Sequence, residues 1–206
     1  HFGLDTLSWA RLGADATGID LSDEAIKEAK ALNEELDLNA RFVRSNVYDL
    51  KENLQDKFDI VFTSYGVIGW LPDLNRWAEV IAHFLKPGGT FYMAEFHPVV
   101  WMFDNDFREV KYAYHNTHEP IVDESTGTYA DRNAPIRYKE YSWNHGLSEV
   151  VTALLDQGLK LNHLHEFPYS PYNCFSHMVQ GPDGYWRIEH LQNMIPMMYT
   201  LKFTKV

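Results

Sequence analysis

The stretch Lys86-Pro87-Gly88-Gly89-Thr90-Phe91-Tyr92-Met93-Ala94 marks an abrupt change of local structure. Before it, apolar residues recur at helical spacing and predict a helix over residues 73–85. Pro-Gly-Gly then predicts a turn, because proline cannot continue a helix and glycine tolerates the backbone angles of tight turns. The apolar run from Thr90 to Ala94 predicts a buried strand. A helix followed by a tight turn and a buried strand is the repeating unit of α/β sheets.

The same alternation of helix and strand extends through most of the chain. Further helices are predicted from Asp5 to Gly13, from Ser22 to Leu36, and from Leu147 to Gly158. Further strands are predicted at residues 14–20, 40–44, 58–63, 159–167 and 197–204. Strands that are separated by helices predict a parallel sheet with right-handed crossovers, so the predicted fold class is α/β.

The composition limits the classes of protein that the chain can represent. Its 206 residues, 45% of them hydrophobic, suit a single domain with a sizeable core. A net charge of −11 argues against nucleic acid as a partner, because binding to phosphates usually needs a basic face. A single cysteine, Cys174, cannot form an internal disulfide and favours a reducing, cytoplasmic compartment. No apolar run approaches the roughly 18 residues of a membrane span, so we predict no membrane partner.

The beginning of the chain departs from this alternating pattern. A doubly wound sheet is built outward from a central first strand, and no strand pattern precedes Gly3. We therefore expect a further N-terminal segment that carries this first strand.

Residues 99–144 form a long insertion that contains no convincing helix. The insertion is rich in aromatic residues, and its acidic residues outnumber its lysines and arginines. An insertion of this length after a core strand is more than a connector. We predict strands and loops that fold as a lid over the carboxyl ends of the sheet, where open α/β sheets bind ligands. The alternative is a hairpin with its own small aromatic cluster and no part in binding.

Three segments together carry a resemblance to a known family. They are Lys86–Ala94, the strand Thr17-Gly18-Ile19-Asp20 with its terminal acid, and His1-Phe2-Gly3. In these segments the chain resembles a class I methyltransferase of the small-molecule type, which depends on S-adenosylmethionine (SAM). The resemblance runs from His1 to Pro98 and resumes from Trp143 to the C-terminus.

The resemblance implies one SAM-binding domain over residues 1–206, with the lid insertion at 99–144. It also implies a Rossmann-like sandwich with a mostly parallel, seven-stranded sheet. The last strand, at residues 197–204, is expected to be antiparallel and to form an edge. The implied function is methyl transfer from SAM to an oxygen, nitrogen or sulfur nucleophile of a small molecule, which leaves S-adenosylhomocysteine as product. The sequence leaves the oligomeric state open.

Gly3 and Asp20 are the main candidates for contacts with the cofactor. Gly3 matches the last glycine of the family's glycine-rich motif, whereas His1 stands where the family usually has another glycine. A glycine lets the backbone approach the ligand, and the helix that follows can direct its amides at a carboxylate. An ordinary turn is the alternative for Gly3. Asp20 can accept hydrogen bonds from both ribose hydroxyls, and its alternative role as a helix N-cap is already offered by Ser22.

The ends of two further strands complete the predicted cofactor site. Asn46 matches the position that reads the adenine amino group, with Val47 beside it, although a turn is the alternative role for Asn46. Ser64 and Tyr65 are expected beside the methionine part and the transferred methyl. The predicted cofactor-binding residues are His1, Phe2, Gly3, Asp20, Leu21, Asn46, Val47, Ser64 and Tyr65.

Methyl transfer mainly requires that nucleophile, methyl and sulfur are aligned, and a base helps when the nucleophile arrives protonated. His97, just past the strand that follows Pro-Gly-Gly, is predicted as the base or a substrate contact, and a locally bonded histidine is the alternative. His145 is predicted to line the site or to cap a helix. Tyr65 and Trp70 are placed to stabilise the sulfonium through their rings, and packing in the core is the alternative for Trp70. The predicted catalytic residues are His97, Tyr65 and His145, and the predicted substrate-lining residues are Trp70, His97, Trp101, Tyr141 and Trp143.

Two other functions stay open at this level. A SAM-binding or regulatory protein without catalysis would fit His1 in the glycine motif and Asn46 in place of aspartate. A nicotinamide-dependent oxidoreductase would also use Asp20. No metal site is predicted, because no cysteine and no clear carboxylate set accompany the paired histidines at 115 and 118 or at 163 and 165.

Overall fold

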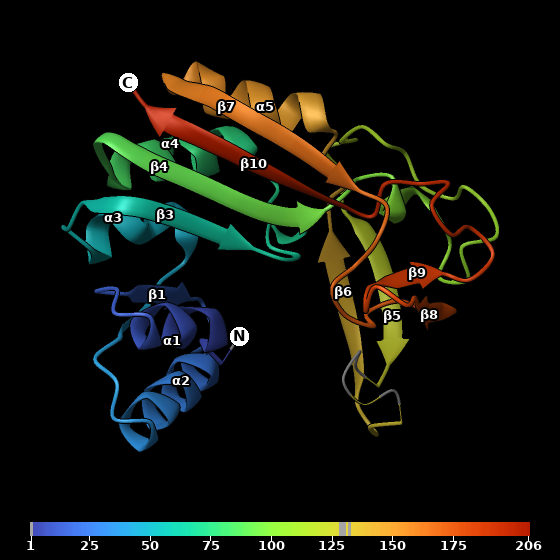
Figure 1. Ribbon diagram of the computed structural model, residues 1–206, viewed down its shortest axis with the longest axis horizontal. Coiled ribbons are helices and arrows are strands. Elements are labelled where there is room, and N and C mark those ends of the chain that lie inside the picture. Colours follow the sequence, from blue (N-terminus) through green and yellow to red (C-terminus); the bar gives the residue numbers. More distant parts are fainter. Residues whose placement is uncertain (1, 128–130, 132) are drawn as a thin grey trace.

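The computed structural model describes residues 2–127, 131 and 133–206. The helices are α1 (Leu4–Arg11), α2 (Asp23–Glu35), α3 (Leu50–Asn53), α4 (Leu74–Phe84) and α5 (Leu147–Asp156), and short 3₁₀ turns are η1 (Val47–Asp49), η2 (Ile68–Trp70) and η3 (Val100–Met102). The strands are β1 (Thr17–Asp20), β2 (Arg41–Arg44), β3 (Phe58–Ser64), β4 (Leu85–Phe96), β5 (Ile121–Thr126), β6 (Arg137–Ser142), β7 (Leu159–Phe167), β8 (Met178–Gln180), β9 (Trp186–Ile188) and β10 (Met198–Lys205). The predicted α/β class is therefore confirmed, with a mixed central sheet (Figure 1).

The central strands divide into two hydrogen-bonded groups. One sheet has the order β3-β4-β10-β7, and β1 pairs with β2 in a separate parallel sheet. The expectation of one seven-stranded sheet therefore differs from the pairing of the described residues, because no ladder joins β1 to β3. As predicted, β10 runs antiparallel to its neighbours. The expectation that β10 is an edge strand is wrong, since it lies between β4 and β7.

The Lys86–Gly89 segment is a bulge at the start of β4, where a turn was expected. Phe58 of β3 pairs with Leu85, whereas Ile60 already pairs with Thr90, so the extra residues are accommodated on β4 alone. Gly88 adopts a left-handed φ of 76°. The helix α4 can thus pass directly into its strand.

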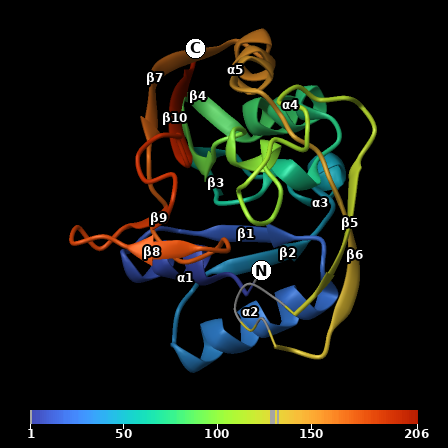
Figure 2. The same ribbon diagram turned by 90° about the vertical axis from the view of Figure 1, so that its right-hand side faces the viewer.

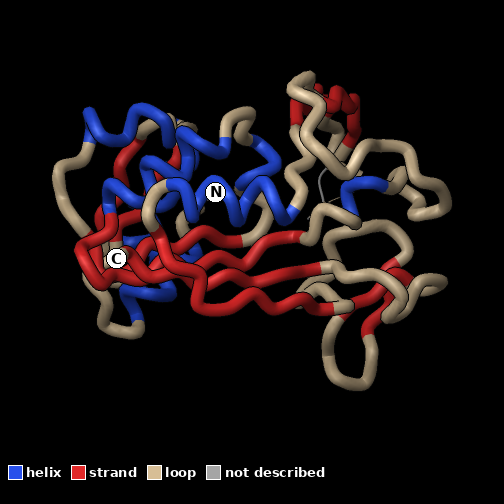
Figure 3. The backbone as a smooth tube through the Cα atoms, turned by 90° about the horizontal axis from the view of Figure 1, so that it is seen from above, coloured by secondary structure: helices blue, strands red, loops and turns tan. Residues whose placement is uncertain are grey.

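A single apolar core joins the four-stranded sheet to the helices α4 and α5. Within this core, the rings of Trp77 of α4 and Phe91 of β4 meet edge to face, with centroids 5.6 Å apart at 76°. Both side chains are almost fully buried. The ammonium of Lys205, at the end of β10, donates to the carbonyls of Ala82 (2.7 Å) and Leu85 (2.9 Å) at the end of α4. The central strands run side by side, and most loops gather beyond one end of them (Figure 3).

Two hairpins stand at the carboxyl ends of β3 and β4. One is formed by β5 and β6 and belongs to the long insertion, and the other is formed by β8 and β9. Figure 2 looks onto this edge and shows the two hairpins on opposite sides of it. Part of the insertion at residues 128–130 and 132 lies outside the described residues. Within the described part of the chain, none of the helices has the length and apolar character that a membrane crossing requires.

Gly89 should tolerate no side chain, because an added Cβ would lie 2.8 Å from the carbonyl oxygen of Lys86 and 3.2 Å from that of Asp59. We expect Gly89→Ala to lower the free energy of unfolding by about 1–3 kcal/mol, the usual cost of overpacking. Urea denaturation followed by circular dichroism measures it. Gly88→Asn is the matched control, since nothing lies within 4 Å of its Cβ position and asparagine tolerates a left-handed φ. An equal loss in both variants would contradict the steric argument.

Candidate active site

The carboxyl ends of β1 and β2 bring two of the predicted residues together. The strands pair in parallel from Thr17 to Asp20, and the N–H of Ser45 donates to the carbonyl of Asp20 at 2.9 Å. Asn46 follows directly. Asp20 and Asn46 therefore lie at neighbouring strand ends, at the edge where open α/β sheets bind ligands.

Side-chain hydrogen bonds fix both residues. One carboxylate oxygen of Asp20 accepts the N–H of Ser22 at 2.8 Å, while the hydroxyl of Ser22 caps α2 by accepting from Ala25 at 3.2 Å, as predicted. The Oδ1 of Asn46 accepts the N–H of Tyr48 at 3.0 Å and so caps η1, which is the turn role that the sequence left open. An amide oxygen has two lone pairs, so Oδ1 retains a second acceptor position beside this cap.

The N-terminus of α1 faces the same edge, and Gly3 determines how closely it packs. Gly3 has a φ of 73°, and an added Cβ would lie 2.5 Å from the ring of Phe42 in β2. No side chain caps the first turn of α1. Phe2 is more than half exposed, and His1, also predicted to contact the cofactor, lies outside the described residues.

One hydrogen bond ties the start of α1 to the end of β3. The hydroxyl of Ser64 donates to the carboxylate of Asp5 at 2.5 Å. Tyr65 follows Ser64, and burial raises the pKa of its phenol, with a further rise from the negative charge of Asp5. The phenol of Tyr65 therefore keeps its proton at neutral pH and is a hydrogen-bond donor there.

Glu95, near the end of β4, is the most constrained polar residue of this region, and the sequence analysis did not select it. Its side chain is 2% exposed. Oε1 accepts the N–H groups of Gly66 (2.5 Å) and Phe96 (2.7 Å), and Oε2 accepts those of Val67 (2.8 Å) and Ile68 (3.2 Å). Burial raises the pKa of this carboxyl, and the four N–H donors oppose the rise. An acid inside an otherwise apolar strand, two residues before His97, was the signal that could have revealed it.

His97 is buried, and both of its ring nitrogens contact the protein. Nε2 lies 2.8 Å from Oε1 of Glu166, and Nδ1 accepts the N–H of Val99 at 3.2 Å. Because Nδ1 accepts, Nε2 carries the hydrogen and donates to Glu166. Burial lowers the pKa of His97, and the pairing with Glu166 partly offsets this. The geometry disfavours the predicted role of base and matches the alternative of a locally bonded histidine.

His145 is enclosed in a similar way. Its Nε2 donates to the carbonyl of Leu71 at 2.8 Å, since a carbonyl only accepts. Its Nδ1 lies 3.0 Å from a carboxylate oxygen of Glu149 in the first turn of α5 and 3.3 Å from the amide of Asn116. The ring therefore links the loop after η2 to the start of α5, and neither nitrogen is turned toward an open site.

The predicted substrate-lining aromatics occupy different positions. Trp70 in η2 and Tyr141 in β6 are about half exposed, so Trp70 is not a core residue. The N–H of Trp143 donates to the carbonyl of Gly69 at 2.8 Å, which joins the insertion to the loop after β3. Trp101 in η3 is part of an aromatic cluster with Phe96.

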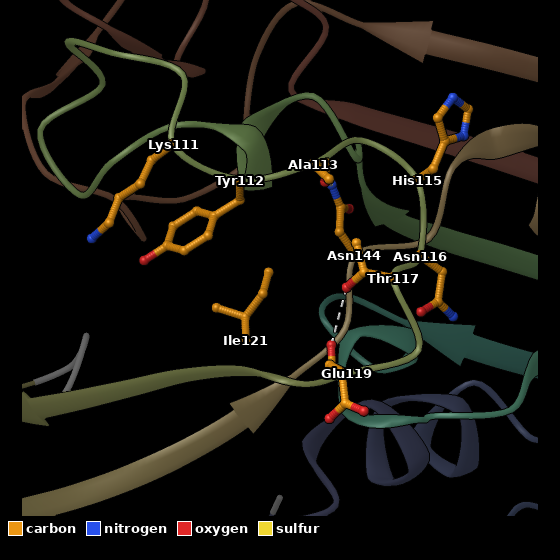
Figure 4. A pocket seen from close by; sticks show the side chains of 9 residues that line it. All are labelled: Lys111, Tyr112, Ala113, His115, Asn116, Thr117, Glu119, Ile121 and Asn144. Atoms are coloured by element: carbon orange, nitrogen blue, oxygen red, sulfur yellow. Dashed lines mark hydrogen bonds between the residues drawn. The ribbon is translucent and has the colours of Figure 1, made fainter.

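A small cavity of about 170 Å³ lies within the insertion itself. It is lined by Lys111, Tyr112, Ala113, His115, Asn116, Thr117, Glu119, Ile121 and Asn144 (Figure 4). The side-chain amide of Asn144 donates to the carbonyls of Pro98 and Ala113. Asn144 thereby fastens the insertion to the end of β4. No group of three or more His, Cys, Asp or Glu side chains gathers to hold a metal ion within the described residues.

Comparison with known proteins agrees with this architecture. Residues 2–89 match the sequence model of the methyltransferase domain family. A putative SAM-dependent methyltransferase from Listeria monocytogenes superposes on all of this chain and 87% of its own, with a TM-score of 0.64 and 17% identity. The chain has the fold of a class I methyltransferase. A geranyl diphosphate C-methyltransferase from Streptomyces coelicolor, solved with S-adenosylhomocysteine, matches all of this chain and 69% of its own, with a TM-score of 0.61 and 15% identity.

Among curated proteins, the ubiquinone biosynthesis O-methyltransferase of Xanthomonas campestris is 34% identical over 92 residues. The matched region is 45% of this chain and 38% of that relative, so the similarity covers well under half of the relative's length. Neither the non-catalytic nor the nicotinamide alternative is favoured by these comparisons.

Within this methyltransferase fold, Glu95→Gln should be costly. Glutamine offers one acceptor oxygen where the carboxylate offers two, so buried N–H groups of the Gly66–Ile68 loop lose their partner. We expect the free energy of unfolding to fall by about 2–4 kcal/mol, since each buried donor left unsatisfied costs about 1–3 kcal/mol. Chemical denaturation measures this loss. Glu166→Gln is the matched control, because its side chain is 48% exposed and the amide oxygen can still accept from His97; a comparable loss there would refute the argument.

His97 should make the fold sensitive to acid. Its pKa is lowered in the folded state, so the unfolded chain binds a proton more readily, and stability falls as the pH drops below the ordinary histidine value of about 6.5. His97→Gln removes this proton uptake, and its stability curve should be flatter below that pH. The difference in slope is at most about 1.4 kcal/mol per pH unit. Denaturant titrations between pH 5 and 8 test it, and parallel curves would show that His97 does not take up this proton.

Proposed function

We propose that this chain transfers a methyl group from SAM to a small molecule. The observation that carries the proposal is the uncapped N-terminus of α1, with Gly3 packed against Phe42, facing the edge where Asp20 ends β1. Amides at a helix N-terminus bind anions, and a carboxylate at a strand end binds a diol. A ligand with a carboxylate and a ribose fits these two groups.

The residues present suit such a ligand. The first turn of α1 would receive the carboxylate of the methionine part, and Asp20 and Leu21 would border the ribose. Asn46 and Val47 would border the adenine. Gly3 supports this assignment, because a side chain there would push α1 away from β2.

The end of β3 would hold the reacting part of the ligand. The hydroxyl of Ser64 already donates to the carboxylate of Asp5, and Tyr65 retains its proton, so Tyr65 is the group at this end of the site that can donate a hydrogen bond to a ligand. SAM, when bound, supplies a methyl group on a sulfonium that is already a good leaving group. The chain would then contribute mainly by aligning the acceptor and excluding water. We propose that the acceptor is an oxygen, nitrogen or sulfur nucleophile, and the O-methyltransferase relative favours oxygen.

We further propose that the insertion at 99–144 acts as the lid of this site. Two of its contacts support this role, the bond from Trp143 to Gly69 and the bonds from Asn144 to Pro98 and Ala113. Both contacts attach the insertion near the carboxyl ends of β3 and β4. Trp70, which directly follows the attached Gly69, would then face the acceptor.

Calorimetric titration of S-adenosylhomocysteine into the chain tests the cofactor. We expect micromolar affinity, and Asp20→Asn should weaken it at least tenfold, about 1.4 kcal/mol, because the amide nitrogen cannot accept from the ribose. Asp23→Asn is the control, since Asp23 is exposed and paired with Arg44 at 2.5 Å. Absence of binding, or equal weakening by both substitutions, would count against the proposed function.

A further inference from the structure

We propose that Tyr65, Trp101 and Tyr172 form the methyl-acceptor site and select an aromatic acceptor; Trp101 and Tyr172 pack on Phe96, and Tyr65 packs on Tyr172. This inference rests on the proposed function and names the class of its substrate. Tyr65 follows β3, Trp101 belongs to η3, and Tyr172 lies in the loop after β7. Three segments that are far apart in the sequence thus contribute one ring each.

The rings contact one another edge to face. The centroid of Phe96 lies 5.6 Å from that of Trp101 and 6.1 Å from that of Tyr172, with interplanar angles of 79° and 69°. Tyr65 and Tyr172 are 6.2 Å apart at 82°. Phe175 closes the base of the cluster, with centroids 5.2 Å from Phe96 and 5.4 Å from Trp101. These are the separations that favour aromatic pairs.

The cluster has a buried side, formed by Phe96, and a solvent-exposed side, formed by the other three rings. Phe96 is 5% exposed, whereas Tyr65, Trp101 and Tyr172 are 41%, 39% and 36% exposed. A group of large, partly exposed aromatic side chains on a buried support is typical of a ligand site. The support is rigid, because Phe96 follows Glu95, whose carboxylate holds the neighbouring Gly66–Ile68 loop.

The position of the cluster fits an acceptor rather than the cofactor. Tyr65 directly follows Ser64, which is bonded to Asp5 in the first turn of α1. The cluster therefore begins where the proposed cofactor site ends. The loop that carries Tyr172 leads on to the β8–β9 hairpin, and Phe96 leads on to the insertion. A flat acceptor on these rings would lie near the points where the chain leaves β4 for the insertion and β7 for the β8–β9 hairpin.

The rings are suited to an aromatic acceptor in particular. Edge-to-face and offset packing depends on the quadrupole of both partners, so a saturated ring of the same size keeps the apolar contact but loses this part of the attraction. The three exposed rings would thus discriminate between two molecules of nearly equal volume that differ only in aromaticity.

Benzyl alcohol and cyclohexylmethanol form such a matched pair of probes, because both carry the same primary alcohol. We would titrate each into the chain saturated with S-adenosylhomocysteine and follow binding by saturation-transfer NMR. Benzyl alcohol should bind at least tenfold more tightly. Trp101→Leu and Tyr172→Leu should each reduce its affinity at least fivefold and leave S-adenosylhomocysteine affinity within twofold. Trp101→Phe and Tyr172→Phe keep a ring and should retain most of the binding.

Trp9→Leu is the control variant, because Trp9 in α1 is 42% exposed and makes an edge contact with Phe62, 5.8 Å between centroids. It should leave the affinity for benzyl alcohol unchanged. Equal affinities for the two alcohols, or an equal loss in the Trp9 variant, would overturn the aromatic site while S-adenosylhomocysteine still binds. Failure of S-adenosylhomocysteine to bind the unaltered chain would instead overturn the proposed function.

Discussion

The carboxylate of Glu95 is the interaction on which the candidate site depends most. It accepts four backbone N–H groups, three of them from the loop that follows β3. A buried charge is costly, and only such a set of donors makes it tolerable. The loop is thereby held to the end of β4, and Tyr65 lies immediately before the held segment. Ser64 is held by its ladder partner Ala94 and by Asp5, and Glu95 fixes the loop that continues from Tyr65.

The end of the insertion and the residue that follows it also bind the segment after this loop. The carbonyl of Gly69 accepts from Trp143, while the carbonyl of Leu71 accepts from His145. The two histidines that the sequence marked as catalytic therefore serve as connections: His97 links the end of β4 to Glu166 of β7, and His145 links the loop to α5. Both rings are buried, whereas the carboxylates that they contact are partly exposed. The open, aromatic surface lies beside them, at Tyr65, Trp101 and Tyr172.

The order of the long helices and strands could be predicted from the sequence, whereas the short elements α3, β8 and β9 and the pairing of the strands could not. Periodicity and capping residues such as Ser22 and Asp73 act locally, so helix and strand bounds were close to those observed. The place of β10 between β4 and β7 depends on contacts between distant segments, which no local pattern records. The positions of Asp20 and Asn46 at neighbouring strand ends could be predicted because strand ends are visible in a sequence, and their contacts with a cofactor stay a prediction. Glu95 and Tyr172 were missed because the groups that they contact belong to segments that are distant in the sequence.

The interior position of β10 also has a consequence for synthesis. In the sequence, β10 follows every other strand of the four-stranded sheet, so it is synthesised last among them. The backbone edges of β4 and β7 that pair with β10 are therefore unpaired until residues 198–205 have emerged from the ribosome. Unpaired edges invite association with other chains, and long-range pairing is slow. Lys205 joins the end of α4 only at that same late moment. The four-stranded sheet therefore cannot close before the last strand of this chain has been synthesised.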